Sequence, residues 1–171
     1  MTESFPKRLF VMGAGPSLEI LYEHRHEAND WGDWAVVRSD LVQPLLKFIK
    51  PKYTIRYWPK GRSFNTVYGI SLEENTKRMG GSSIGAFILN FQEHGGKELF
   101  LFGFDGDSSG YWRNQPGLQA PIDLADHGKD CDDMADLPVW ESTKLYHIGK
   151  TRNKFMTEIS IDDLKGTYLN A

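Results

Sequence analysis

The sequence contains one cysteine and no long apolar run, and each absence excludes a class of protein. Because Cys131 stands alone, neither an internal disulfide nor a cysteine-rich zinc site can form. Residues 1–8 lack the apolar core of a signal peptide, and no apolar stretch reaches the ~18 residues that a membrane-spanning helix needs. We therefore expect a cytoplasmic protein with no membrane span.

An excess of basic charge is also missing. The chain carries 20 lysine and arginine residues against 23 aspartate and glutamate residues, for a formal net charge of −3. Because proteins that bind duplex nucleic acid usually present a basic face, we do not expect duplex nucleic acid as a partner. The length of 171 residues and the hydrophobic content of 40% predict a single globular domain that spans residues 1–171.

What the sequence does contain is an alternation of short apolar segments with amphipathic ones. The apolar segments predict strands at residues 8–12, 34–38, 53–57, 99–102 and 145–148. The amphipathic segments predict helices from residue 16 onward and at residues 41–49, 82–94 and 161–164. This alternation predicts an α/β fold with a single doubly wound, mostly parallel, Rossmann-like sheet. Residues 107–140 are rich in Asp, Gly, Pro and Ser, and we expect them to form an irregular lid.

A glycine-rich turn follows the first expected strand, and it consists of Gly13, Ala14, Gly15, Pro16 and Ser17. A turn between a strand and a helix places backbone N–H groups and the positive end of the helix dipole together, which favours a phosphate. The glycines allow the backbone to approach a ligand closely. We predict that this turn binds the phosphates of a nucleotide. A purely structural turn is the alternative, since the third glycine of the dinucleotide-binding fingerprint is missing.

Several segments, in order along the chain, resemble one superfamily. They are residues 13–18, the sequence IKPKY at 49–53, Gly81-Ser82-Ser83, and GGKELFLFGFD at 95–105. Together they resemble the bacterial sialyltransferases that use CMP-sialic acid, the motility-accessory-factor glycosyltransferases and the archaeal-type 6-hydroxymethylpterin diphosphokinases. The resemblance covers residues 8–110 and, more loosely, 143–165.

The resemblance implies that three clusters line a nucleotide: residues 13–17, then Arg38, Ser39 and Asp40, and finally Ser82 and Ser83. The side chains suit this interpretation, because Arg38 can pair with a phosphate and Ser39 or Asp40 can reach a ribose hydroxyl. In open α/β sheets the ligand lies beyond the carboxyl ends of the strands, where all three clusters are expected. A surface ion pair or a helix cap is the alternative for Arg38 and Asp40.

An Asp-x-Asp pair follows the expected strand at 99–102. Asp105 and Asp107 offer hard carboxylate oxygens, which suit Mg²⁺ or Mn²⁺ bridging a diphosphate. Asp105 can alternatively hold a ribose, and Asp107 can be a loop residue in an Asx turn. Tyr111 and Trp112 come shortly after this pair, and we interpret them either as stacking or sugar-contacting groups or as packing of the lid on the sheet.

Two residues near the C-terminus are candidate catalytic groups. His147 ends the last expected strand, and its ordinary pKa of about 6.5 suits a general base. The sialyltransferases carry a histidine in the segment YIGHSKN, which is similar to residues 147–153 here, and Lys150 occupies the place of that histidine. Lys150 is therefore the alternative catalytic residue, together with Asp105.

These observations lead to one functional hypothesis with two alternatives. The hypothesis is a nucleotide-sugar-dependent glycosyltransferase, similar to the sialyltransferases, with a CMP-sugar or related donor and an unidentified acceptor. The first alternative is an ATP-dependent diphosphokinase of the hydroxymethylpterin type, for which magnesium is mandatory. The second is a non-catalytic nucleotide-binding module. The oligomeric state is left open.

Overall fold

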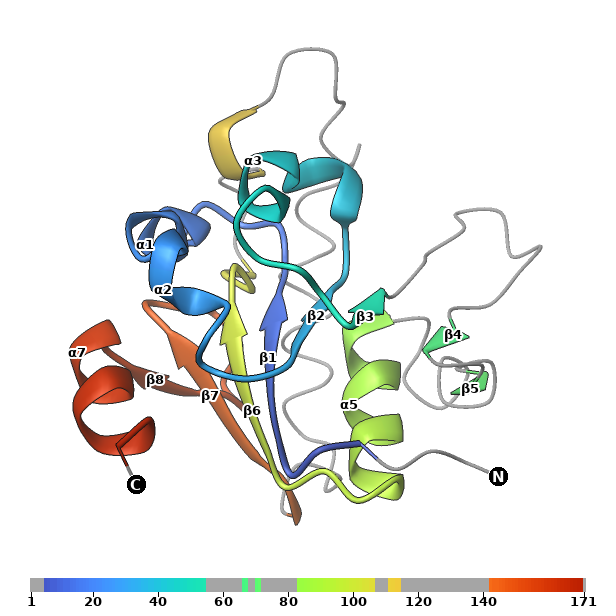
Figure 1. Cartoon of the computed structure of the whole chain (residues 1–171). Helices are drawn as coiled ribbons and strands as arrows, with labels where there is room; N and C mark the ends of the chain where they lie inside the picture. Colours follow the sequence, from blue (N-terminus) through green and yellow to red (C-terminus); the bar gives the residue numbers. More distant parts are fainter. Residues whose placement is uncertain are drawn as a thin grey trace.

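Six parallel strands form the central sheet of this computed structural model (Figure 1). The structure describes residues 5–54, 66–67, 70–71, 83–106, 111–114 and 142–170. The strands of the sheet are β1 (Arg8–Met12), β2 (Trp34–Val36), β3 (Tyr53–Thr54), β6 (Glu98–Phe102), β7 (Lys144–Ile148) and β8 (Thr157–Ile159). Their order in the sheet is β3-β2-β1-β6-β7-β8.

This strand order confirms the predicted Rossmann-like α/β fold. The chain starts in the middle of the sheet at β1 and moves outward to β3, then returns to β6 beside β1 and moves outward in the other direction. The neighbours β1 and β6 pair over their full length, from Arg8 opposite Glu98 to Met12 opposite Phe102. The connections therefore leave these two carboxyl ends in opposite directions, and such a switch point is where open α/β sheets bind ligands.

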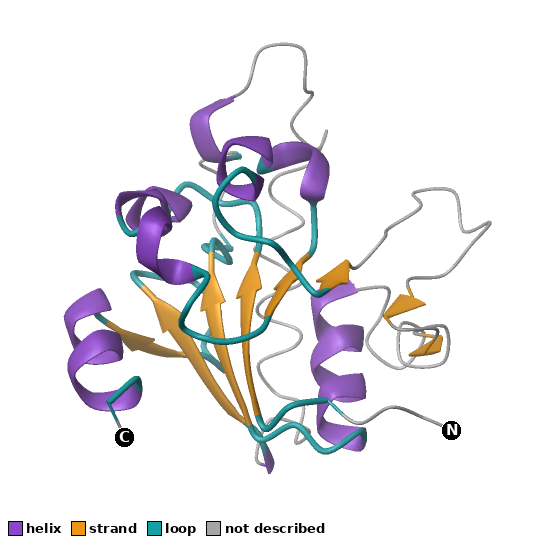
Figure 2. Cartoon of the chain, viewed as in Figure 1, coloured by secondary structure: helices purple, strands orange, loops and turns teal. Residues whose placement is uncertain are grey.

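Helices cover both faces of the sheet (Figure 2). The helical segments are α1 (Leu18–Glu23), α2 (Arg25–Ala28), η1 (Ser39–Leu41), α3 (Gln43–Leu46), α5 (Ser83–Glu93), η2 (Trp112–Asn114), α7 (Ile161–Asp163) and the π-helix η4 (Leu164–Tyr168). Outside the main sheet, β4 (Thr66–Val67) pairs antiparallel with β5 (Ile70–Ser71). Within the described part of the chain, no helix combines the length and the apolar character needed to cross a membrane.

Two hydrophobic clusters, one on each face, hold these layers together. Along β1, Leu9 and Val11 point into the cluster that α5 covers, whereas Phe10 and Met12 point into the cluster beneath α1 and α2. All four side chains are fully buried, which explains why the strand reads as a continuous apolar run rather than an alternating one. Burial on both faces is thus the physical reason for the apolar pattern that predicts the strand.

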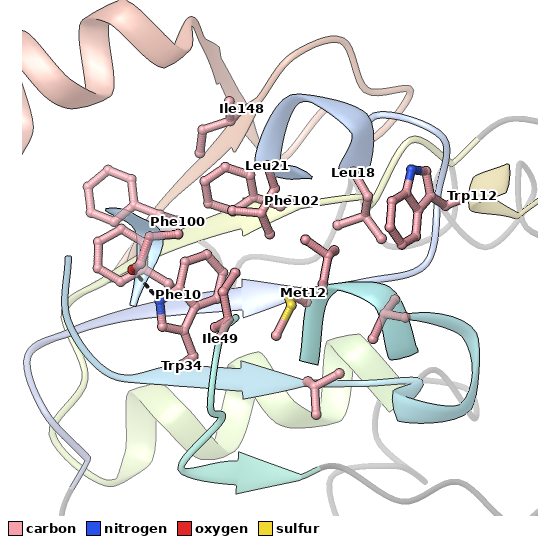
Figure 3. Packing of buried hydrophobic residues seen from close by; sticks show 14 of the residues in the cluster. Phe10, Met12, Leu18, Leu21, Trp34, Ile49, Phe100, Phe102, Trp112 and Ile148 are labelled. Atoms are coloured by element: carbon pink, nitrogen blue, oxygen red, sulfur yellow. Dashed lines mark hydrogen bonds between the residues drawn. The ribbon is translucent and has the colours of Figure 1, made fainter. Parts of the chain in front are cut away.

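Aromatic rings dominate the second of these clusters (Figure 3). Phe10, Phe100 and Tyr146 occupy the same register on three adjacent strands, and their rings stack with centroids 5.2 Å apart at each step. The buried indole of Trp34 donates a hydrogen bond of 2.8 Å to the Ala28 carbonyl at the end of α2, drawn as a dashed line in Figure 3. The stack joins three strands of the sheet, and the hydrogen bond attaches the end of α2 to β2.

The structure differs from the sequence-based expectation at several element boundaries. In place of the helix expected at 41–49 the structure has η1, which ends at Leu41, and α3, which ends at Leu46. Pro44 lies in the first turn of α3, where a missing N–H is tolerated. The first helix begins at Leu18 rather than at residue 16, and β2 ends at Val36 rather than at residue 38. The short strand β8 was not expected. Residues 55–57 and most of the expected lid lie outside the described residues.

Candidate functional site

The candidate site lies at the carboxyl ends of β1 and β6, where the glycine-rich turn meets the turn after β6. The N–H of Gly13 donates to the Phe102 carbonyl at 2.7 Å, and the N–H groups of Ala14 and Gly15 donate to the Gly103 carbonyl at 3.2 and 2.8 Å. The backbone donors that the phosphate interpretation requires are therefore hydrogen-bonded to the neighbouring turn in this structure.

The two glycines are needed for this close packing. A Cβ atom at Gly13 would lie 2.6 Å from the Gly103 carbonyl oxygen. At Gly15 it would lie 2.8 Å from the same oxygen and 2.9 Å from the Cγ of Asp105. Any larger residue would push the two turns apart, so the glycines here serve the contact between β1 and β6.

The Asp105 carboxylate occupies the space beside the glycine-rich turn. One of its oxygens accepts a 2.9 Å hydrogen bond from the Ser17 N–H, and the other accepts a hydrogen bond from the Ser17 hydroxyl. Asp105 is only 9% exposed, and pairing with Ser17 satisfies a carboxylate that would otherwise be costly to bury. Asp105 therefore accepts hydrogen bonds from the two donors of Ser17, a residue that the sequence analysis assigns to a phosphate.

The predicted Mg²⁺ or Mn²⁺ site is described only in part. Both oxygens of Asp105 accept hydrogen bonds from Ser17, and Asp107 lies outside the described residues. Among the residues that the structure describes, no three His, Cys, Asp or Glu side chains gather in a way that could hold a metal ion. The assignment of Asp105 and Asp107 to a metal therefore stays a prediction.

His147 connects the ends of β6 and β7. Its Nε2 accepts a 3.0 Å hydrogen bond from the Phe104 N–H, and its Nδ1 lies 3.0 Å from the Gly149 carbonyl, which can only accept. The ring is therefore the neutral tautomer with its proton on Nδ1. It is 0% exposed, and this burial lowers the pKa of His147. With both nitrogens engaged, the geometry gives His147 a structural role, and its assignment as a general base stays a prediction.

The loop after β7 is fastened to the same turn. The carbonyl of Phe104 accepts hydrogen bonds from the Thr151 hydroxyl at 2.6 Å and from the Asn153 side-chain amide at 2.8 Å. Lys150 is the second residue of this loop, beyond the carboxyl end of β7, and it is exposed. The sequence analysis assigns no role to Thr151 and Asn153. Their position shortly after an apolar strand could have indicated that they lie at the carboxyl edge of the sheet.

At the end of β2, Arg38 and Asp40 form an ion pair with two hydrogen bonds. The Nε and Nη2 atoms of Arg38 donate to the two carboxylate oxygens of Asp40 at 3.0 and 2.8 Å. This contact raises the pKa of Arg38 and lowers the pKa of Asp40. Ser39 lies between them and begins η1, and its carbonyl accepts a 2.8 Å hydrogen bond from the Gln43 side chain.

A short segment of the expected lid, residues 111–114, is anchored on the glycine-rich turn and on α1. The Trp112 N–H donates to the Ala14 carbonyl at 2.8 Å, and the Trp112 indole donates to Glu19 at 2.7 Å. Arg113 donates two further hydrogen bonds to Glu19 and lies over the Tyr22 ring at 4.1 Å from its centroid. The contact with Arg113 lowers the pKa of Glu19. Glu19 and Arg113 are site residues that the sequence did not indicate.

The third predicted cluster is only partly described. Ser82 lies outside the described residues, and Ser83 is the first residue of α5. This end of α5 lies at the level of the carboxyl end of β3 (Figure 1), on the edge of the sheet that carries the other two clusters.

Comparisons with protein-family models, with curated proteins and with solved structures find no match for this chain. The resemblance inferred from its motifs therefore stays a prediction.

Proposed function

We propose that this chain binds a nucleotide at the carboxyl edge of its sheet and acts as a nucleotide-sugar-dependent glycosyltransferase similar to the sialyltransferases. One observation supports the proposal most: four segments far apart in the sequence meet beside the switch point between β1 and β6. These segments are residues 13–17, 38–40, 103–105 and 111–113. The hydrogen bonds described above join three of them, and Arg38 Nη1 donates a 3.5 Å hydrogen bond to the Tyr111 hydroxyl, which joins residues 38–40 to them. Ligands of open α/β sheets bind at this position.

The proposed reaction requires little from the protein beyond positioning and charge stabilisation. The acceptor oxygen forms a bond to the anomeric carbon of the sugar while the bond from that carbon to the nucleotide phosphate breaks, and the acceptor proton passes to solvent or to the departing phosphate. Negative charge develops on this phosphate, so a nearby cation lowers the barrier. We assign the stabilisation of this negative charge to Lys150, because Lys150 is exposed at this edge of the sheet.

A ligand screen by thermal denaturation tests nucleotide binding. A ligand that binds only the folded state raises the melting temperature, by an amount equivalent to about 2.7 kcal/mol at a concentration of about 100 times Kd. We expect CMP to raise the melting temperature without magnesium. A response to ATP with magnesium alone would instead favour the diphosphokinase, and no response to CMP, UDP, GDP or ATP would refute nucleotide binding.

Release of CMP from CMP-sialic acid, with water as the acceptor, tests the catalytic part of the proposal. We expect Lys150→Ala to slow this release about tenfold, the effect of losing one charge-assisted hydrogen bond in the transition state. Lys154→Ala is the matched control, because Lys154 is an exposed lysine on the same loop. Equal rates for the two variants would remove Lys150 from the mechanism.

A further inference from the structure

The ion pair at the end of β2 is poorly suited to bind a phosphate. Both carboxylate oxygens of Asp40 accept hydrogen bonds from the guanidinium of Arg38, so the two charges neutralise each other. The side chains are 36% and 53% exposed, so a ligand can reach them. A phosphate that approached Arg38 would also meet the negative charge of Asp40. The expectation that Arg38 pairs with a phosphate is therefore not favoured by this geometry.

Arg38 and the neighbouring Tyr111 present two flat groups, a guanidinium and an aromatic ring. The Tyr111 hydroxyl lies 3.5 Å from Nη1 of Arg38, and the guanidinium carbon lies 5.7 Å from the centre of the Tyr111 ring. Tyr111 is only partly buried. Aromatic rings and guanidinium planes are the surfaces on which nucleobases stack, and stacking needs no net charge.

The position of Tyr111 is fixed by its neighbour in the chain. Trp112 is 2% exposed, and its backbone N–H and its indole N–H bind Ala14 and Glu19 respectively. This anchor attaches the chain next to Tyr111 to the glycine-rich turn, and the Tyr111 ring lies near Arg38. The ring is thus positioned before any ligand arrives, which reduces the entropic cost of binding.

We propose that Tyr111, Arg38 and Asp40 form the nucleobase subsite of the nucleotide site. This inference rests on the proposed function and deepens it. The base stacks against the Tyr111 ring and the Arg38 guanidinium, and Asp40 accepts a hydrogen bond from an exocyclic amino group. Each carboxylate oxygen retains acceptor capacity beyond its bond to Arg38. The subsite therefore favours amino-bearing bases, namely cytosine, adenine and guanine, over uracil.

Calorimetric titration with CMP, UMP and cytidine tests this assignment, with ribose 5-phosphate as a probe for the phosphate alone. We expect Tyr111→Leu to raise the Kd for CMP and for cytidine by about tenfold, the usual loss when one base–aromatic stack is removed. Tyr111→Phe keeps the ring and removes only the hydroxyl that lies 3.5 Å from Arg38, so it should weaken CMP less than Tyr111→Leu does. Asp40→Asn should reduce the preference for CMP over UMP. The affinity for ribose 5-phosphate should stay the same in all three variants.

Arg38→Gln and Arg8→Gln form a matched pair, because Arg8 is also ion-paired and partly exposed but lies at the opposite end of the sheet. Arg38→Gln should weaken CMP and cytidine alike, and Arg8→Gln should weaken neither. Equal CMP binding by Tyr111→Leu and the wild type would overturn the subsite, as would a loss of ribose 5-phosphate binding in Arg38→Gln. A wild-type protein that binds no nucleotide would overturn the proposed function and this inference with it.

Discussion

Replacing His147 by alanine is expected to lower the free energy of unfolding by about 3–5 kcal/mol. The substitution leaves the Phe104 N–H and the Gly149 carbonyl without their partners and opens a cavity beside them. Chemical denaturation of the two proteins measures the difference. His26→Ala is the matched control, because His26 is exposed and its loss should change stability little.

The same variant separates a structural histidine from a catalytic one. If His147→Ala were as stable as the wild type but turned over CMP-sialic acid about 100-fold more slowly, the ring would be the general base after all. A stability loss with no selective effect on the rate would assign it to the structure.

The unfolding free energy of the wild type is also expected to fall in acid because of His147. Burial lowers the pKa of His147 in the folded state, whereas in the unfolded chain it is about 6.5. Below that pH the unfolded chain binds a proton that the folded ring cannot accept without losing the Phe104 hydrogen bond. The contribution of His147 to the free energy of unfolding is therefore fully present above about pH 6.5. It decreases as the pH falls, by up to about 1.4 kcal/mol per pH unit.

Denaturation series in mildly acidic buffers check this slope. Asp105, 3.9 Å from the His147 ring, and Glu158 both face it and partly offset the effect of burial. The comparison that isolates His147 is the difference in slope between the wild type and His147→Gln. Identical slopes would contradict the expectation.

A single methyl group at Gly15 is expected to reduce stability by about 3 kcal/mol. The Cβ atom of Gly15→Ala would lie within 3 Å of the Gly103 carbonyl and of the Asp105 side chain, so the turns after β1 and β6 must separate. Gly166→Ala is the control, because no atom lies within 4 Å of the corresponding Cβ position and alanine favours a helix. Denaturation midpoints of both variants measure the contrast.

The opposite result at Gly15 would restore the initial interpretation of the turn. If Gly15→Ala folded with wild-type stability but no longer bound CMP, the backbone of this turn would have to face the ligand rather than the neighbouring turn.

Much of the fold follows from apolar pattern alone. The runs at β1, β6 and β7 are apolar because both faces of a central parallel strand are covered, and they were predicted within one residue. The strand β8 has no such signature, because it has three residues at the edge of the sheet and two of them are exposed. A strand with exposed residues is compatible with many sequences, so the apolar pattern of the sequence does not predict it.

The sequence identified some members of the candidate site but not the contacts between them. Ser17 and Asp105 were both identified from sequence, one as a phosphate ligand and the other as a metal ligand. Their mutual hydrogen bonds join residues 88 positions apart, and the bond from Phe104 to His147 spans 43 positions. A residue type indicates which partners are chemically acceptable, whereas the fold determines which partner is present.

The strand order also constrains how this chain acquires its structure. The ion pair between Arg8 and Glu98 joins residues 90 positions apart, at the beginning of the two central strands. Proteins dominated by such distant pairings fold slowly, because a long loop must close before the pairing compensates for it. During synthesis β1 emerges first, and its β6 side is an unpaired strand edge until most of the chain has followed. Until β6 is synthesised, this edge can associate with other strands.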